Sequence, residues 1–352
     1  MSKDDVFHEA LSEWMKGSGP ESDIVISSRI RLARNLQSLP FPTLATAKYA
    51  AETVERVKAV MDTEELNEVS NFDFIALDEV SDLSKRVLVE KHLISPALVN
   101  ESKNGALILS ENESISIMIN EEDHLRMQIL HPGFQLKEAW DLANQIDDIF
   151  ESQLDYAFDE RRGYLTSCPT NVGTGMRASV MMHLPALVLT QQINRILSAI
   201  SQVGLVVRGL YGEGSEAIGN LFQISNQITL GQSEEDIIDN LYGVAKQIIE
   251  HERAARQKLM LDSKIRMMDR VNRSYGILSY ATIIDSKEAA QRLSDVRLGM
   301  DLGLLKQVSA QVMNELLVMT QPSYLQQYAG EPLSADERDL RRAELIRSRL
   351  SN

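Results

Sequence analysis

Residues 115–129 read ISIMINEEDHLRMQI, and this stretch decides the fold of the surrounding chain. Apolar residues occupy every second position from 115 to 119 and again from 125 to 129, which is the pattern of half-buried β-strands. A short polar break separates the two runs. We therefore expect two neighbouring antiparallel strands, with residues 121–124 at their connection.

A second strand pair is predicted further along the chain. Residues 204–207 and 222–229 have strand character, and they flank a glycine-rich segment at 209–219. A helix should follow from Ser233, a good N-cap residue that precedes three acidic residues. Residues 1–255 thus read as mixed helix and strand.

Strand patterns stop at about residue 256. Apolar residues step by three or four along residues 305–319, which predicts a long amphipathic helix that ends before Pro322. Its apolar face could pack within the chain or against a second copy. Residues 334–337 read SADE, a capping box that announces a last helix. We predict two domains, residues 1–255 and an all-helical part at 256–352, with the boundary near 255–263.

Composition points to a soluble globular protein. The chain has 352 residues, of which 43% are apolar and 25% are charged. The N-terminus lacks an apolar run behind a basic flank, and the best apolar run, residues 180–189, is too short and too interrupted to span a membrane. Cys168 is the single cysteine, so we expect no disulfide and no cysteine metal site, and a cytoplasmic location.

The net charge of −15 argues against direct binding to nucleic acid or to an anionic membrane, both of which favour a basic surface. It is compatible with cationic partners such as arginine-rich protein segments, although solubility alone would explain it equally well. The six histidines are scattered and form no metal-ligand pattern. We therefore expect no metal held by the protein itself.

Four short motifs carry the residues that could do chemistry. They read SSRIR (27–31), NEEDHLR (120–126), CPTNVGTGMR (168–177) and RGLYGE (208–213). The chain contains no G-x-x-x-x-G-K-S/T sequence, so a bound triphosphate would have to be neutralised in another way. Arginines suit this task because they stay charged and offer paired planar donors to phosphate oxygens.

In their order and spacing these motifs resemble those of the phosphagen kinases, the ATP:guanidino phosphotransferases, which transfer a phosphoryl group from ATP to a guanidinium nitrogen. The resemblance covers about residues 20–255 and implies an α+β fold, an antiparallel sheet flanked by helices. It implies ATP as cofactor, with Mg²⁺ bridging the phosphates. The nucleotide-binding residues that it implies are Ser27, Ser28, Arg29, Ile30, Arg31, His92, Arg126, Arg177, Ala178, Ser179, Val180, Met181, Arg208, Gly209, Leu210, Tyr211, Gly212 and Glu213. The loop at residues 171–175 would bring backbone N–H groups close to the nucleotide.

The same resemblance assigns the acceptor side of the reaction. A guanidinium is cationic and a poor nucleophile, so carboxylates must orient it and accept its proton. Glu122 matches the catalytic carboxylate of the family, and Glu213 matches the second carboxylate that binds the guanidinium. Cys168 matches a reactive cysteine that positions the substrate and tunes charge; a buried, inert thiol is the alternative interpretation.

The chain as a whole is similar to the bacterial protein-arginine kinase branch of this family. In creatine and arginine kinases a sizeable helical domain precedes the first motif and helps to recognise a small substrate; its absence before Ser27 favours a protein substrate. The resemblance implies that arginines of unfolded proteins and of a CtsR-like repressor are phosphorylated, marking proteins for degradation by ClpC–ClpP in the heat-shock response. It also implies an McsA-like activator and a homodimer formed through the helical domain.

The last predicted helix contains a further motif, RDLRRA at residues 338–343. Arg338 and Arg342 are four residues apart and thus on one face, with Asp339 beside them. An ordinary charged surface helix would look the same, but the resemblance implies that Arg338, Asp339, Arg342 and Ala343 bind phosphoarginine allosterically.

Two departures from the family pattern further weaken an interpretation as a small-substrate kinase. Leu210 and Tyr211 replace a polar pair, and Gln223 stands where an aspartate is common. Two alternatives to a protein-arginine kinase stay open from the sequence: a kinase of free arginine, and a non-catalytic adaptor that binds phosphoarginine.

Overall fold

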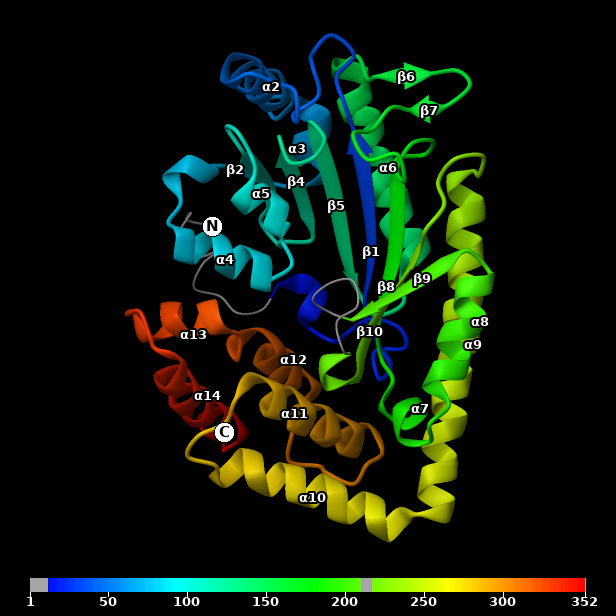
Figure 1. The fold of residues 1–352 in the computed structure, drawn as a ribbon, viewed down its shortest axis with the longest axis vertical. Coiled ribbons are helices and arrows are strands. Elements are labelled where there is room, and N and C mark those ends of the chain that lie inside the picture. The colour runs from blue at the N-terminus through cyan, green and yellow to red at the C-terminus, as the bar shows by residue number, and fades with distance from the viewer. Residues whose placement is uncertain (1–11, 210–216, 352) are drawn as a thin grey trace.

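The computed structural model describes residues 12–209 and 217–351. Its main feature is an antiparallel eight-stranded sheet in the order β2-β3-β4-β5-β1-β8-β10-β9 (Figure 1). The strands are β1 (Val25–Arg34), β2 (Phe72–Ala76), β3 (Ala106–Ser110), β4 (Ile115–Ile119), β5 (Leu125–Pro132), β8 (Met176–His183), β9 (Leu205–Gly209) and β10 (Leu221–Asn226), with a separate small pair, β6 (Phe158–Asp159) and β7 (Gly163–Tyr164).

Helices surround the sheet and follow it in the chain. Those up to residue 262 are η1 (Glu13–Met15), α2 (Ala47–Val60), α3 (Glu64–Val69), η2 (Leu77–Glu79), α4 (Asp82–Glu90), α5 (Pro96–Asn100), α6 (Leu136–Gln153), α7 (Pro185–Leu189), α8 (Ile193–Gln202), η3 (Ile218–Asn220) and α9 (Glu234–Asp262). The later ones are α10 (Lys264–Tyr280), α11 (Ser286–Asp301), α12 (Ala310–Met319), α13 (Pro322–Ala329) and α14 (Ala335–Leu350). The predicted α+β class is confirmed.

The central strands give the sheet two chemically different faces. Ile30 of β1 lies between Ile129 of β5 and Ala178 of β8, and all three are fully buried in the core that the sheet shares with α6 and α9. The neighbouring position, Arg31, lies between Gln128 and Arg177 on the opposite face. Alternation along each strand therefore places the core on one face and the arginines on the other.

The predicted hairpin is confirmed, since β4 and β5 pair antiparallel and residues 120–124 connect them. The expectation of half-burial is wrong for β4, which is buried along its whole length. The reason is that α4 and α5 form a second apolar cluster with Leu107 and Met118 on the face that was expected to be exposed. The second predicted pair, β9 with β10, is confirmed, but β10 ends at Asn226.

Local capping signals located two helices well. Ser233 forms a capping box with Asp236 at the start of α9, and Ser334 forms one with Glu337 at the start of α14. The helix predicted over 305–319 is shorter, because Ser309 caps α12 and the helix begins at Ala310. Residues 305 and 308 are still buried, so this apolar stripe packs within the chain.

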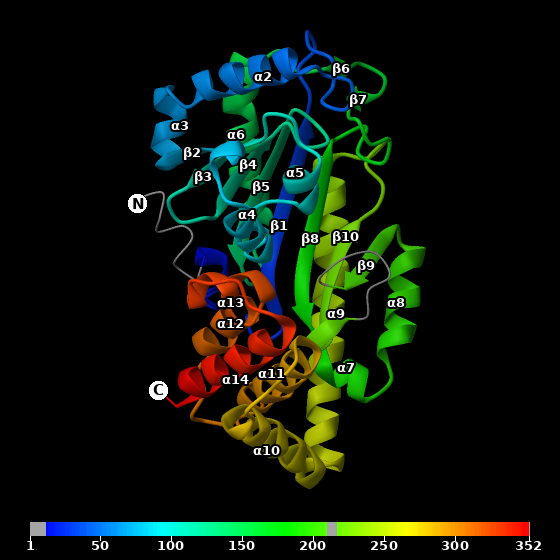
Figure 2. The same cartoon turned by 60° about the vertical axis from the view of Figure 1, so that its left-hand side comes forward.

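The C-terminal helices cover one end of the sheet. In Figures 1 and 2, α9 extends past the sheet to α10, and α11 to α14 return towards the N-terminal segment. There α13 packs on α4, α12 on η1 and α11 on η3. Within the described ranges, the structure contains no helix that is long and apolar enough to cross a membrane.

Candidate active site

The five arginines of the motifs lie on one face of the sheet. Arg29 and Arg31 come from β1, and Arg31 is directly opposite Arg177 of β8. Arg126 of β5 is opposite Ala33, two positions along β1 from Arg31. At the other side of the sheet, Arg208 of β9 is opposite Gln223 of β10. Residues more than 170 positions apart in the chain thus form one band of positive charge.

Two members of this band, Arg29 and Arg31, form no ion pair with a carboxylate of the described residues. Burial, followed by the charges of Arg126 and Arg177, lowers the pKa of Arg29 to about 10. Burial, followed by the charges of Arg29, Arg126 and Arg177, lowers the pKa of Arg31 well below its usual value. The charge of Glu121 opposes this shift. The Nε of Arg31 is buried and has no hydrogen-bond partner within the described part of the chain. Such a surface favours a polyanion such as a triphosphate, which would supply the missing partners.

Neutral side chains hold Arg29 in place. Its Nε donates to Ser179 Oγ (3.3 Å), and its terminal nitrogens donate to Gln128 Oε1 (3.5 Å) and Gln223 Oε1 (2.9 Å). Gln223, which departs from the aspartate common in the family, therefore orients Arg29 without neutralising it. An aspartate here would form an ion pair and reduce the attraction of Arg29 for phosphate.

Arg126 is oriented by the first glutamate of the hairpin turn. Glu121 Oε1 lies 2.5 Å from the Arg126 guanidinium and also accepts a hydrogen bond from Ser95 Oγ. Burial raises the pKa of Glu121, but the charge and hydrogen bond of Arg126 outweigh it, so that the pKa is lowered overall. Glu121 is thus committed to positioning Arg126.

Glu122, the next residue, is exposed and accepts no hydrogen bond from a side chain that the structure describes. It lines an open cavity of about 520 Å³ together with Glu101, Lys103 and Arg126. Partial burial and the charges of Asp123 and Glu121 raise the pKa of Glu122, against the effect of Arg126 and Arg177. An available carboxylate with a raised pKa is suited to accepting a proton.

Asp123 connects this turn to the Cys168 loop. Its Oδ1 accepts hydrogen bonds from Asn35 Nδ2 (2.6 Å) and from the backbone N–H of Ser167 (2.7 Å). Cys168 is half-buried, and its Sγ lies 3.0 Å from Thr170 Oγ1. Sequence reasoning did not find Asn35, because nothing in its local pattern distinguishes it from a turn residue.

His92, predicted to be a nucleotide-site residue, lies near Arg29. Its ring contacts Trp14 edge to face, with centroids 5.8 Å apart. Burial, followed by the charge of Arg29, lowers the pKa of His92 to about 4, so the ring is neutral at physiological pH. Both rings line a recess of about 10 Å³ with Ser27 and Met181, and a nucleoside could enter only if these side chains moved.

The loop at residues 171–175 is fixed by its own contacts. Thr229 Oγ1 donates to the carbonyls of Thr170 and Val172, and Gly173 exchanges two backbone hydrogen bonds with Tyr164. Gly173 has φ +115, and a Cβ there would lie 2.5 Å from Thr229 O. The N–H groups of Asn171 and Gly173 therefore bind within the protein.

Several residues of the predicted nucleotide set lie elsewhere. Ile30, Ala178 and Val180 are completely buried in the core on the opposite face, and Ser28 is buried there as well. Their side chains can support the site only by anchoring β1 and β8. Gly209 ends β9 beside Arg208, whereas residues 210–213, including Leu210, Tyr211, Gly212 and Glu213, lie outside the described residues.

The RDLRRA motif is on α14, away from the arginine band. Arg342 is 2% exposed, and its guanidinium donates to Thr320 O (2.8 Å), Ile284 O (2.9 Å) and Asp339 Oδ1 (2.5 Å). Ala343 is buried, and Arg338 donates to Leu333 O (3.0 Å). The structure thus does not bring the two arginines together in an open site, because Arg342 joins α14 to neighbouring segments.

Comparisons with known proteins agree with this geometry. Residues 52–255 match the family model described as ATP:guanido phosphotransferase, C-terminal catalytic domain, and residues 264–352 match that described as Protein-arginine kinase McsB C-terminal domain. Lombricine kinase has a similar fold, with a TM-score of 0.59 and 24% identity over 68% of each chain. The duplicated taurocyamine kinase of Schistosoma mansoni has a TM-score of 0.59 and 23% identity over 67% of this chain and 34% of its own.

Full-length relatives are far more similar. Proteins named protein-arginine kinase from Brevibacillus brevis and Halalkalibacterium halodurans are 63% and 65% identical over 99% of this chain and 98% of their own. The one from Bacillus subtilis is 59% identical over 99% of this chain and 96% of its own. The resemblance stated from the motifs is confirmed: the chain belongs to the protein-arginine kinases, enzymes of the ATP:guanido phosphotransferase family that use ATP as phosphoryl donor.

Proposed function

We propose that this enzyme transfers the γ-phosphoryl group of MgATP to the guanidinium of arginine side chains in proteins. The observation that carries the proposal is the juxtaposition of the arginine band with the turn that presents Glu122. Phosphoryl transfer depends on in-line positioning and on stabilisation of charge at the moving group. The arginine band can stabilise the charge of a triphosphate, and the turn provides a carboxylate that can act on the acceptor.

The step balances at the acceptor nitrogen. The bond between the γ-phosphorus and its bridging oxygen breaks, an N–P bond forms, and the guanidinium loses one proton. Glu122 takes this proton, and ADP leaves with the charge that Arg29, Arg31, Arg126, Arg177 and Arg208 stabilise. Cys168, held beside the turn through Asp123, would help to orient the guanidinium. Glu213, outside the described residues, matches the second carboxylate that binds the guanidinium in the family.

Mg²⁺ would enter as part of the substrate. No group of three or more histidine, cysteine, aspartate or glutamate residues suited to hold a metal occurs in the parts of the chain that the structure describes. We infer that the ion is held by nucleotide phosphates and water. Its role would be to neutralise charge on the phosphates.

A protein acceptor is favoured over free arginine. The Glu122 cavity is open, at about 520 Å³, and exposed Leu44 adjoins its lining residues Pro42 and Thr43. An apolar side chain there could contact residues that flank the target arginine. The full-length similarity to proteins named protein-arginine kinase supports the same choice.

The resemblance also implies where the enzyme acts in the cell and with which partners. The enzyme would be cytoplasmic, would respond to an McsA-like activator, and would mark unfolded proteins and a CtsR-like repressor for a ClpC-type unfoldase during stress. A homodimer through the helical part is supported by exposed Leu261, Ile265 and Met268, which lie where α9 meets α10.

Allosteric binding of phosphoarginine by residues 338–343 is part of this proposal. Because Arg342 is buried, binding there would require α14 to shift and release the Ile284 and Thr320 carbonyls. If Arg338→Ala and the wild type are activated equally by added phosphoarginine, the allosteric role is excluded.

The deciding experiment supplies labelled MgATP, in parallel, to free arginine and to an unstructured protein that contains arginine. Acid lability of the product distinguishes N-linked phosphate from serine or threonine esters. Acid-labile label on the protein, with little on free arginine, is the expected result. Label mainly on free arginine would establish the small-substrate alternative. No label, even in the presence of an activator, would support the non-catalytic adaptor that binds phosphoarginine.

A further inference from the structure

A cavity of about 310 Å³ lies where one end of the sheet meets the C-terminal helices. Its walls come from β1, β8, η3, β10, α11 and α12, and from the segment that leads into α13. Most of the lining is apolar, including Ile26, Leu221, Leu293 and Met313. Small-molecule pockets are typically about 300–1,000 Å³, so a compact ligand would fit. None of its described lining residues belongs to the five arginines of the site or to the RDLRRA motif, although Arg342 donates to the carbonyl of Thr320, a lining residue.

Among the described residues, the lining includes no acidic side chain and one that is cationic, Arg297. Arg297 is 4% exposed, and its terminal nitrogens donate to the neutral oxygens of Asn314 (2.5 Å) and Ser22 (2.8 Å). Within the described residues, no carboxylate lies within 4.0 Å of it. Buried arginines are normally paired with an anion, so Arg297 is an unusual wall residue for an apolar cavity.

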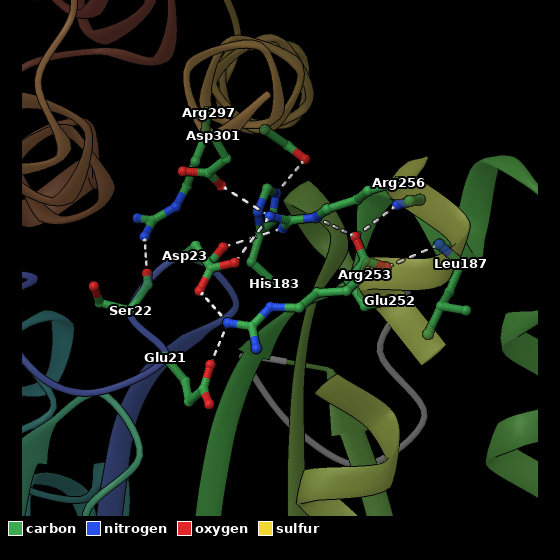
Figure 3. Close-up of polar contacts among 12 residues, drawn as sticks. Glu21, Ser22, Asp23, His183, Leu187, Glu252, Arg253, Arg256, Arg297 and Asp301 are labelled. Carbon is green, nitrogen blue, oxygen red and sulfur yellow. Dashed lines mark hydrogen bonds and ion pairs between the residues drawn. The ribbon is translucent and has the colours of Figure 1, made fainter. Parts of the chain in front are cut away.

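The nearby carboxylates form ion pairs with two other arginines, and the charges of Asp301 and Asp23 also act on Arg297 from beyond ion-pair distance. Burial, opposed by Asp301 and aided by the charge of Arg256, still lowers the pKa of Arg297. Figure 3 shows Glu21 and Asp23 beside Arg253, and Glu252 and Asp301 beside Arg256. The Glu252 carboxylate is 2.9 Å from Arg256 and also accepts N–H bonds from the first turn of α7. None of these four acidic residues lines the cavity. Among the described lining residues, Arg297 therefore represents this charged network alone.

Two buried nitrogen atoms of the lining residues have no hydrogen-bond partner among the described residues: Nε of Arg297 and Nδ1 of His183. The other ring nitrogen of His183 is bonded to Ser294 Oγ at 2.8 Å. Burial, followed by the charges of Arg297 and Arg256, lowers the pKa of His183 well below its usual value, so the ring is neutral. Unpartnered polar atoms in a protein interior are rare, and a ligand could satisfy these two after a small shift of the side chains that cover them.

We propose that this cavity binds a small organic monoanion, a carboxylate attached to an aromatic or branched alkyl group. The carboxylate would pair with Arg297 and lie next to His183. The apolar part of the ligand would fill the space among Ile26, Leu221, Leu293 and Met313. This arrangement gives the buried guanidinium a charged partner and covers apolar surface at the same time.

The position connects the site to nucleotide binding. His183 and Leu221 are directly paired on β8 and β10, and Leu221 shares its strand face with Gln223. Gln223 is the residue that accepts a hydrogen bond from Arg29, at 2.9 Å. A ligand that presses on Leu221 therefore acts two positions from the arginine band, and we expect it to change the KM for MgATP.

The test uses isothermal titration calorimetry on the full chain with 3-phenylpropionate and its neutral analogue, 3-phenylpropanamide. We expect the acid to bind roughly 10- to 100-fold more tightly than the amide, the range that a charge-assisted contact provides. Arg297→Met should remove this preference. Arg292→Met is the matched control, because Arg292 lies on the same helix, pairs with Glu288 and does not line the cavity.

A second variant keeps the test decisive if Arg297→Met does not fold. Ala290→Leu adds volume to the cavity wall without changing charge and should weaken the binding of both probes. Absence of binding, equal affinities of acid and amide, or unchanged affinity in both Arg297→Met and Ala290→Leu would overturn the site. Binding without any change in the KM for MgATP would overturn the coupling to the arginine band.

Discussion

Three consecutive acids in the hairpin turn have different environments, and these environments assign their roles. Glu121 is buried against Arg126, Asp123 binds the backbone of the Cys168 loop, and Glu122 is exposed at its open cavity. Charge pattern alone cannot separate them. The separation comes from partners contributed by α5, by β5 and by the segment before Cys168.

Glu122→Gln tests the role of the available carboxylate. Because the amide cannot take the proton, kcat should fall by about 10²- to 10⁴-fold, while the Kd for MgATP stays within a factor of two or so. Steady-state transfer and nucleotide titration measure the two quantities. Glu65→Gln, on exposed α3, is the control and should behave as the wild type. A collapse of nucleotide affinity in Glu122→Gln would place this residue at the phosphates instead.

The pH dependence of transfer should reflect the raised pKa of Glu122. A base works only when ionised, so kcat/KM should be lost as pH falls through this pKa, at a higher pH than for an ordinary glutamate. Asp123→Asn removes a neighbouring negative charge and keeps an oxygen to accept the bonds from Asn35 and Ser167. Its acidic limb should therefore lie at lower pH. An unmoved limb in this variant would show that another group is titrating.

At the scale of elements, the sheet and helix α9 define the geometry of the site. Strands β1, β5, β8 and β9 each contribute arginines to one face, and α6 and α9 cover the other. Helix α9 passes residue 255 without a break and ends at Asp262. The domain boundary placed near 255–263 stays a prediction.

The capping box at Ser233 should contribute measurably to stability. Ser233→Ala removes the hydrogen bond to the Asp236 N–H and should lower the free energy of unfolding by about 1 kcal/mol. Ser263→Ala is a matched control, because Ser263 precedes α10 but its side chain makes no capping bond. Chemical denaturation of both variants provides the measurement, and equal losses would argue against a specific role for the Ser233 box.

At the scale of the whole molecule, the C-terminal helices connect one end of the catalytic sheet to a corner rich in exposed apolar side chains. Leu261 and Ile265 are 85% and 83% exposed, and Met268 lies one turn further along α10. Apolar groups clustered this way on a soluble protein often mark an interface. This corner is the surface through which we expect the dimer to form.

The double substitution Leu261→Glu with Ile265→Glu should prevent the proposed dimer from forming, because four buried charges at a symmetric contact would repel one another. Light scattering coupled to size-exclusion chromatography measures the mass. Leu44→Glu, at a comparably exposed position beside the Glu122 cavity, should leave the mass unchanged. If the double variant keeps the mass of a dimer, the interface lies elsewhere.

The sequence by itself determined the family, the order of the motifs, the 115–129 hairpin and the starts of α9 and α14. These features depend on local signals: alternation along a strand, an N-cap serine and an acidic residue three positions later. Tertiary structure decided the rest. It buried the second face of β4 under α4 and α5, and it enclosed Arg342 among backbone carbonyls. It also placed Asn35 next to Asp123. Such outcomes depend on contacts between residues far apart in the chain, and no local pattern of residues encodes which distant element will cover a surface.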